Sequence, residues 1–268
     1  MFVQEENVMK KLIALLLAVL LIAGLSACGA KNSDSDLAYV KDKGTLVVGI
    51  TDFAPMDYKD DNGEWIGFDA DMAKAFAETL GVDVEFVEID WGSKHLELEA
   101  KNIDVVWNGM TLTDDVKNLM DCSNAYCTNA QVVIVPAAVA DQYQTAEDCA
   151  ALNFAVESGS AGEEMAAANN FNYIPVDTQS KAVMEVDSKT SDACIIDLLM
   201  AGAMIGEGTA YPDLVPTVSL NSEEYGVGFR KGSDLVDALN KFFADSYKDG
   251  SMMECAATYG LQFALIEQ

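Results

Sequence analysis

The sequence has 268 residues, with 44 Asp or Glu against 16 Lys or Arg, and a formal net charge of −28 at pH 7. This charge makes nucleic-acid binding unfavourable, because neutralising phosphates requires Lys and Arg. It favours solubility, and it can also create a negative field that steers cations toward the protein.

The N-terminal segment has the order of a secretory signal. Lys10 and Lys11 precede an apolar run over 12–23, which ends in the tetrapeptide LSAC at 25–28. A membrane-spanning helix needs about 20 apolar residues, so this run indicates a signal peptide. Small residues before Cys28 predict a lipoprotein cleavage site, with 1–27 removed and Cys28 lipidated. The alternative is an ordinary signal peptide with a chance cysteine. The polar stretch at 28–38 is predicted to be a flexible tether.

The body of the chain alternates strand-like and helix-like segments. Alternating or continuous apolar residues predict strands, and apolar residues at helical spacing predict helices. Asp69 is expected to be an N-cap and Gly81 to end the same helix. The first set has strands at 45–50, 82–89, 105–107 and 130–135 and helices at 69–80, 93–101 and 113–120. The second has strands at 153–156, 172–175, 193–197 and 225–229 and helices at 161–169, 180–186, 198–205 and 233–247.

Two such sets of similar size predict an α/β protein of two lobes with mostly parallel sheets. Ligands of open α/β sheets bind beyond the carboxyl ends of the strands, so the expected site is the cleft between the lobes. Polar loops follow the strands at 51–55, 90–92, 108–111, 159–162 and Asp197.

No constellation typical of an enzyme is present. The sequence has no phosphate-binding or dinucleotide-binding glycine motif, and its one histidine, His95, allows no zinc-protease motif. We therefore predict no cofactor, no metal and no catalysis. Most of the cysteines after Cys28 are expected to be small buried apolar side chains, although a bridge between Cys122 and Cys127 stays open. These cysteines are at 122, 127, 149, 194 and 255.

Seven segments carry a family resemblance through their order and spacing. They are GTLVVG at 44–49, GFDADMA at 67–73, NIDVV at 102–106, NGMTLT at 108–113, VESGS at 156–160, SDACIID at 191–197 and YGVGFRKG at 225–232. Together they resemble the family 3 extracellular solute-binding proteins, the polar amino-acid receptors of ABC importers. The resemblance covers about 37–259.

The resemblance implies a type II periplasmic-binding-protein-like fold. Two crossing strands, near 131–136 and 221–227, would join lobe 1 (39–131 and 225–268) to lobe 2 (132–224), and the ligand would be clamped by closure about this hinge. It also implies a monomer that delivers an amino acid or a similar molecule to an ABC permease, from a lipid anchor outside the cytoplasm.

The resemblance assigns roles to loop residues as well. Aromatic rings would sandwich the ligand, the 108–111 loop would meet its amino and carboxylate groups, the loop at the second-lobe helix would meet it from the other side, and an acid would pair with its ammonium. The predicted ligand-binding residues are Asp52, Phe53, Trp91, Asn108, Gly109, Thr111, Ser160, Ala161, Gly162 and Asp197.

One position departs from the family pattern. The pattern has a carboxylate-binding arginine three residues after Thr113, where this chain has Val116, and its single arginine, Arg230, is expected to lie far from the pocket. One explanation is that backbone amides near 111 and 162 hold the carboxylate, with Lys94 or Lys117 nearby. The other is that the ligand is an amine or amide without a free carboxylate.

Three functions remain in competition. The leading one is a transport receptor without catalysis. The others are a sensory binding subunit and an enzyme on the same fold, such as a dehydratase, for which Glu97 and Asp52 are the candidate acids or bases.

Overall fold

The computed structural model describes residues 35–268, so the predicted signal peptide and Cys28 lie outside the described residues. Residues Asp36–Gln268 form one compact unit. Its first helix, α2 (Asp36–Lys43), begins inside the range predicted as a tether. In this part of the chain, no helix is long and apolar enough to cross a membrane.

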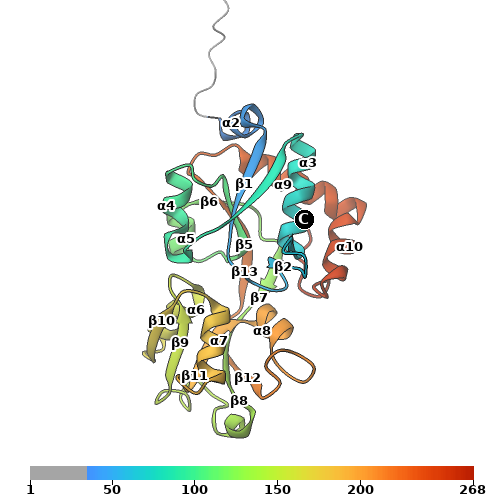
Figure 1. Ribbon diagram of the computed structural model, residues 1–268. Helices are drawn as coiled ribbons and strands as arrows, with labels where there is room; N and C mark the ends of the chain where they lie inside the picture. Colours follow the sequence, from blue (N-terminus) through green and yellow to red (C-terminus); the bar gives the residue numbers. More distant parts are fainter. Residues whose placement is uncertain (1–34) are drawn as a thin grey trace, which may run out of the picture. The chain divides into compact units, whose positions relative to one another are not determined.

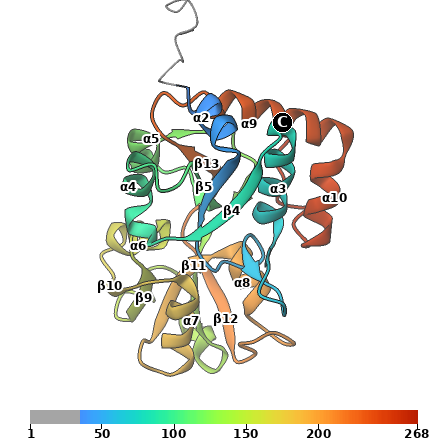
Figure 2. The same ribbon diagram turned by 45° about the horizontal axis from the view of Figure 1, so that its top comes forward.

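The first sheet has the strand order β4-β1-β5-β13-β6, and β7 also pairs with β13. Strand β1 is parallel to β4 and β5, whereas β13 runs antiparallel to β5. Figures 1 and 2 show α3, α9 and α10 on one face and α4 and α5 on the other. The strands are β1 (Thr45–Ile50), β4 (Asp83–Glu88), β5 (Val105–Thr111), β6 (Asp121–Cys122), β7 (Cys127–Asn129) and β13 (Glu223–Phe229); the helices are α3 (Phe68–Leu80), α4 (Lys94–Glu99), α5 (Asp114–Leu119), α9 (Leu235–Asp249) and α10 (Ser251–Thr258).

The second sheet has the strand order β10-β9-β11-β8-β12, with β9 parallel to both β10 and β11 and β8 antiparallel to β11. Helices α7 and α8 pack on one face and α6 on the other. The strands are β8 (Gln131–Pro136), β9 (Asn153–Glu157), β10 (Asn172–Val176), β11 (Ala193–Asp197) and β12 (Leu214–Ser219). The helices are α6 (Ala161–Ala168), α7 (Gln179–Asp187) and α8 (Leu198–Met204), and the short helix η2 (Ala137–Gln142) follows β8.

Two short pieces lie in the chain between strands of the first sheet. They are the separate hairpin of β2 (Tyr58–Lys59) and β3 (Trp65–Ile66), between β1 and β4, and the short helix η1 (Trp91–Ser93), between β4 and β5.

The chain passes between the two sheets twice, at Ala130 and at 220–222. The passages are bonded to each other: the Leu220 amide donates to the Gln131 carbonyl at 2.8 Å, and the Gln131 amide donates to Asn221 Oδ1 at 2.6 Å. We call the part built on the first sheet lobe 1 and the part built on the second sheet lobe 2. The two-lobed α/β fold is confirmed, while the residue bounds given above for each lobe stay a prediction.

Helix α3 corrects one prediction. The residue at its N-cap is Gly67, and Asp69 lies fully buried inside the first turn. Its Oδ2 accepts hydrogen bonds from the Gly109 amide at 2.6 Å and from the Tyr126 hydroxyl at 2.7 Å. Asp69 therefore ties the helix to the middle of β5. The predicted end of the helix at Gly81 is confirmed.

Strand β5 corrects a second prediction. It continues through Thr111, so 108–111 is strand and not a loop. The polar residues and Gly109 suggested a loop, but pairing with β13 keeps the segment extended, with a register shift opposite it between Gly226 and Gly228. Gly109 has φ +54°, and an added Cβ would lie 2.6 Å from the Phe53 ring. The left-handed conformation of Gly109 thus lets the Phe53 ring lie against the polar end of β5.

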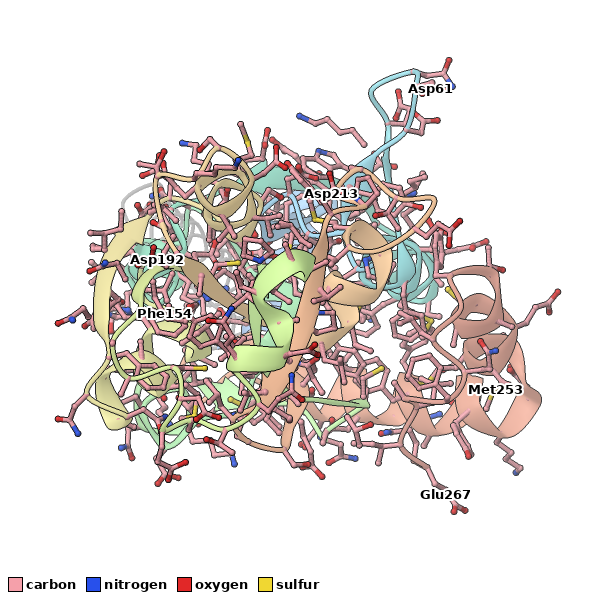
Figure 3. All side chains as sticks on the ribbon, turned by 90° about the horizontal axis from the view of Figure 1, so that it is seen from below. Asp61, Phe154, Asp192, Asp213, Met253 and Glu267 are labelled. Carbon is pink, nitrogen blue, oxygen red and sulfur yellow. The ribbon has the colours of Figure 1, made fainter. Side chains whose placement is uncertain are left out.

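The five described cysteines are all free thiols, so Cys122 and Cys127 are not bridged. Three are buried and two are half-buried, which confirms that most are small apolar side chains in the core. The acidic charge reaches the surface at many points; Asp61, in the β2–β3 loop, and Glu267 extend outward in Figure 3.

Candidate functional site

A narrow cleft forms where strand ends of the two lobes meet. Its free volume is about 20 Å³, enough for roughly one water molecule, so a solute enters only if the lobes separate. The lining comes from both lobes: Thr51, Phe53, Trp91, Lys94, Asn108, Gly109, Met110, Thr111, Thr113, Val116, Glu157, Gly159, Ser160, Ala161, Glu164, Gln179 and Asp197.

Eight of the ten predicted ligand-binding residues line this cleft, and Asp52 and Gly162 do not. Asp52 is exposed at the surface. Partial desolvation of its carboxyl group, and then the charge of nearby Glu88, raise its pKa. Gly162 is buried in the first turn of α6, where an added Cβ would lie 2.9 Å from the Ile195 carbonyl oxygen. Its lack of a side chain is explained by close packing.

On the lobe 1 side, the Asn108 side chain is directed into a polar network. Its Oδ1 accepts from the Thr51 amide and hydroxyl, at 2.9 and 2.7 Å, and its Nδ2 donates to Asp57 Oδ2 at 2.8 Å. Asn108 therefore fixes the ends of β1 and β5 relative to each other. Its side-chain donors are already used before any solute binds.

Below this network lie two fully buried carboxyl groups, Asp57 and Asp69, each with one oxygen that has no hydrogen-bond partner. Burial raises the pKa of both, to about 7 for Asp69, and the charge of Asp69 raises the pKa of Asp57 further. Two adjacent buried carboxyl groups are expected to hold a proton, since ionising both in the core is costly.

On the lobe 2 side, Asp197 ends β11 and is fully buried among donors. Its Oδ1 accepts from Asn129 at 2.5 Å, Gln131 at 3.1 Å and the Tyr225 hydroxyl at 2.6 Å, and its Oδ2 accepts from Gln179 at 2.5 Å. Burial raises its pKa to about 7. Each carboxylate oxygen has about two acceptor positions, so Oδ2, which accepts one bond, retains room for one donor from a solute.

Helix α6 points its N-terminus at the cleft. Ser160 is its N-cap, and the Ser160 hydroxyl oxygen accepts from the Glu163 amide at 3.2 Å. The first amides of a helix lack intrahelical partners and carry partial positive charge. The start of α6, at Ala161, is therefore suited to a carboxylate.

Lys94 is the one positively charged side chain among the described residues that line the cleft. It is 8% exposed, although it belongs to the short helix α4 of lobe 1. Its Nζ donates to the Gly159 carbonyl of lobe 2 at 3.0 Å and to the Trp91 carbonyl at 3.2 Å, and lies 4.7 Å from the centre of the Trp91 ring. Burial lowers its pKa to about 8, against the opposing effect of Glu157.

Two acids complete the lining. Glu157 ends β9 and is 3% exposed; burial and then nearby Asp197 raise its pKa to about 8. Glu164 lies on α6 and accepts from the Thr113 hydroxyl of lobe 1 at 3.2 Å. The bond from Thr113 and the one from Lys94 to Gly159 are both made across the cleft.

Several lining residues were not predicted from the sequence, chiefly Glu157, Glu164 and Gln179. For Glu157 a signal existed, because it ends a buried strand as Asp197 does. Gln179 starts α7 and reaches the site only through the packing of that helix on β9 and β11. Lys94 was considered and does line the cleft.

The other charged candidates lie elsewhere. Lys117 is exposed, and Glu97 accepts from its neighbour Asn102, so neither lines the cleft. With Asp52 exposed too, neither acid considered for an enzyme faces the site. Arg230 is bonded to Asp36 and to the Ile103 carbonyl, as expected for an arginine outside the pocket.

Comparisons with known proteins agree with this geometry. The family model for bacterial extracellular solute-binding proteins, family 3, matches residues 46–262. The arginine-binding extracellular protein ArtP of Bacillus subtilis is 29% identical over 250 residues, 91% of this chain and 95% of its own length. The L-cystine-binding protein TcyJ of Escherichia coli is 29% identical over 88% of this chain and 90% of its own.

Solved structures give the same result. An ABC uptake transporter substrate-binding protein from Streptococcus pneumoniae with bound histidine has a TM-score of 0.78 and 27% identity, and covers 87% of this chain and 99% of its own. The ancestral amino acid-binding protein AncCDT-1, a precursor of cyclohexadienyl dehydratase, has a TM-score of 0.77 and 31% identity, over 84% of this chain and 99% of its own. The two-lobed chain with its polar cleft therefore belongs to the bacterial extracellular solute-binding proteins, family 3.

Proposed function

We propose that this chain is the solute-binding lipoprotein of an ABC importer and that it captures an amino acid or a close derivative. Lipidation of Cys28 would hold it at the membrane outside the cytoplasm, and closure of the lobes about the two passages would present the loaded form to the permease. The proposal is supported by family membership and by relatives named for binding arginine, L-cystine and histidine.

The observation that carries the proposal is the position of Lys94. Its ammonium is bonded to the carbonyl of Gly159, the residue before the N-cap of α6. A carboxylate at the free amides of α6 would therefore lie beside a buried positive charge. This pairing replaces the carboxylate-binding arginine that Val116 does not provide. Asp197, with one acceptor position left, would receive the solute ammonium.

A second candidate is an amine that lacks a carboxylate. The excess of acid over base in the lining favours it, since Glu157, Glu164 and Asp197 face a single Lys94. The role of Lys94 separates the two: it is needed for a carboxylate and is unfavourable for an amine alone.

A thermal-shift screen of the purified protein tests the proposal. The panel contains the common amino acids, their amides, polyamines, betaines and short peptides. At about 1,000 times the dissociation constant, binding adds roughly 4 kcal/mol to the free energy of unfolding, and the melting temperature should rise by about 8–16 °C. We expect free amino acids to give the hits. Hits confined to amines or amides would select the second candidate, and no hits would refute both.

Substitution of Lys94 by Met then tests the carboxylate position by calorimetry with the best amino acid. A lost charge-assisted hydrogen bond costs about 1.5–3 kcal/mol, so affinity should fall at least about tenfold. The matched control is Lys117→Met, because Lys117 is an exposed lysine outside the cleft, and its affinity should be unchanged. Equal losses in both variants would contradict the assignment.

A further inference from the structure

Glu157 is a buried acid with one carboxyl oxygen that has no hydrogen-bond partner. Its side chain lines the cleft at the end of β9, and its Oε1 is fully buried without a hydrogen-bond partner. Lys94, the nearby cation, gives its hydrogen bonds to two backbone carbonyls. Within the described chain, Glu157 takes part in no ion pair.

Several polar neighbours in the lining direct their donors away from this oxygen, and the Gln179 amide, which acts on the Glu157 carboxyl, donates to Asp197 at 2.5 Å. The hydroxyl of Thr111 donates to Glu223 at 2.9 Å, and the hydroxyl of Thr113 donates to Glu164. Thr51 and Asn108 donate into the lobe 1 network described above. Glu157 Oε1 therefore stands at the cleft as an acceptor without a partner, which a donor on a bound solute would satisfy.

The charge balance indicates what that donor is. Three acids and one lysine line a cleft that closes almost completely, so the closed site has more acidic than basic groups. Asp197 would receive the ammonium of a zwitterion and Lys94 its carboxylate, and Glu164 is exposed, so the buried Glu157 would be left without a cation, which is unfavourable. A solute with an additional positive charge would give Glu157 a charged donor.

We infer that the solute carries a net positive charge, as a basic amino acid does, and that Glu157 is the residue that selects for that charge. The inference rests on the proposed function. In this arrangement the carboxylate lies at α6 beside Lys94, and a second cationic group, an ammonium or a guanidinium, bonds to Glu157 Oε1. The raised pKa of Glu157 agrees, because a buried carboxyl without a cation favours its neutral form.

The experiment compares solutes that differ in the charge of the side chain. The probes are L-arginine with L-citrulline, which has nearly the same shape but a neutral urea, and L-lysine with L-norleucine. Dissociation constants are measured by calorimetry at pH 8 for the wild type, for Glu157→Gln, and for Glu147→Gln as a control. Glu147 is an exposed acid of lobe 2, so its substitution removes the same charge outside the cleft.

The wild type should prefer at least one charged probe over its neutral partner by about tenfold or more. Glu157→Gln should reduce this ratio to within about threefold, and Glu147→Gln should preserve it. Because the ratio cancels losses from imperfect folding, a structural role of Glu157 would not change it. Binding of neutral amino acids alone, or an unchanged ratio in Glu157→Gln, would overturn the inference and leave the proposed function standing. Failure of every amino acid in the wild type would overturn both.

Discussion

At the scale of residues, the cleft contains carboxyl groups that are partly protonated near neutral pH. Burial raises the pKa of Glu157 to about 8 and that of Asp197 to about 7. A bound cation favours their ionised forms, so binding should release protons. Lys94 and Asp90 also face Glu157, and Lys94 has a pKa of about 8, so the effect is cleanest below that pH.

The affinity for L-arginine should therefore rise between pH 6 and pH 8, by up to about tenfold per pH unit for each proton released. Arginine keeps its own charges over this range. Glu157→Gln should retain only the contribution of Asp197, whose pKa is about 7, so its affinity should rise less steeply between pH 7 and pH 8 than that of the wild type. Calorimetry in buffers of different ionisation enthalpy counts the protons directly. An affinity that falls as pH rises in the wild type would contradict this account.

At the scale of elements, two loops approach each other so closely that only glycine fits. Gly159 precedes α6 in lobe 2, and an added Cβ would lie 2.6 Å from Gly92 Cα of lobe 1. This backbone contact stands beside the bond from Lys94 to the Gly159 carbonyl. A side chain at 159 would hold the two lobes apart.

Gly159→Ala should therefore weaken solute binding by at least about tenfold. Its φ of +72° also costs an L-residue about 1–2 kcal/mol of stability. Gly208→Ala in lobe 2 is the control, with φ +86° and nothing within 4 Å of the added Cβ. Both variants should lose similar stability in denaturant unfolding, but only Gly159→Ala should lose affinity. Equal affinities would show that the contact does not limit closure.

The elements also show how far the sequence predicts the fold. Strands β1 and β11 have the predicted bounds because each is a continuous apolar run. The continuation of β5 through Gly109 depends on pairing with β13, more than 100 residues away, and no local pattern reports it. Helix α10, strand β12 and the hairpin have no counterpart among the predicted elements. Asp69 is a residue type typical of an N-cap, but the fold buries it within the first turn of α3.

In the candidate site, too, some residues are predictable from the local sequence and others depend on the tertiary structure. Residues at the ends of predicted strands and loops, such as Phe53, Trp91 and Ser160, line the cleft as expected. Lys94 and Gln179 reach it from helices, and their direction depends on how those helices pack. The sequence therefore predicts which edges form the site, and the tertiary structure decides which charges face it.

At the scale of the whole molecule, buried carboxyl groups couple stability to pH. Burial raises the pKa of Asp57, Asp69, Glu157 and Asp197 above the values of an unfolded chain. Between the unfolded and folded values the folded state binds more protons, so stability is greatest below this range and falls as pH rises through it. A tenfold difference between the folded and unfolded acid dissociation constants of one carboxyl corresponds to about 1.4 kcal/mol.

The free energy of unfolding, measured with denaturant and without solute, should thus be lower at pH 8 than at pH 5. Repulsion within a chain of charge −28 acts in the same direction. Salt separates the two causes, because 1 M salt screens surface charges but hardly affects buried groups. The pH dependence should persist at 1 M NaCl. If the pH dependence disappeared at 1 M NaCl, repulsion between surface charges would be its cause.

The two bonded passages between the sheets have a consequence for how such a protein can change. Because the segment from Ala130 to Ser222 leaves lobe 1 and returns to it at adjacent points, it is topologically an insertion with neighbouring ends. It carries Glu157, the N-terminus of α6 and Asp197 as one continuous stretch of sequence. A single recombination that exchanges this cassette would replace half of the recognition surface and leave the other half intact. The lobe 2 part of the solute specificity can therefore change in one step while the lobe 1 part stays the same.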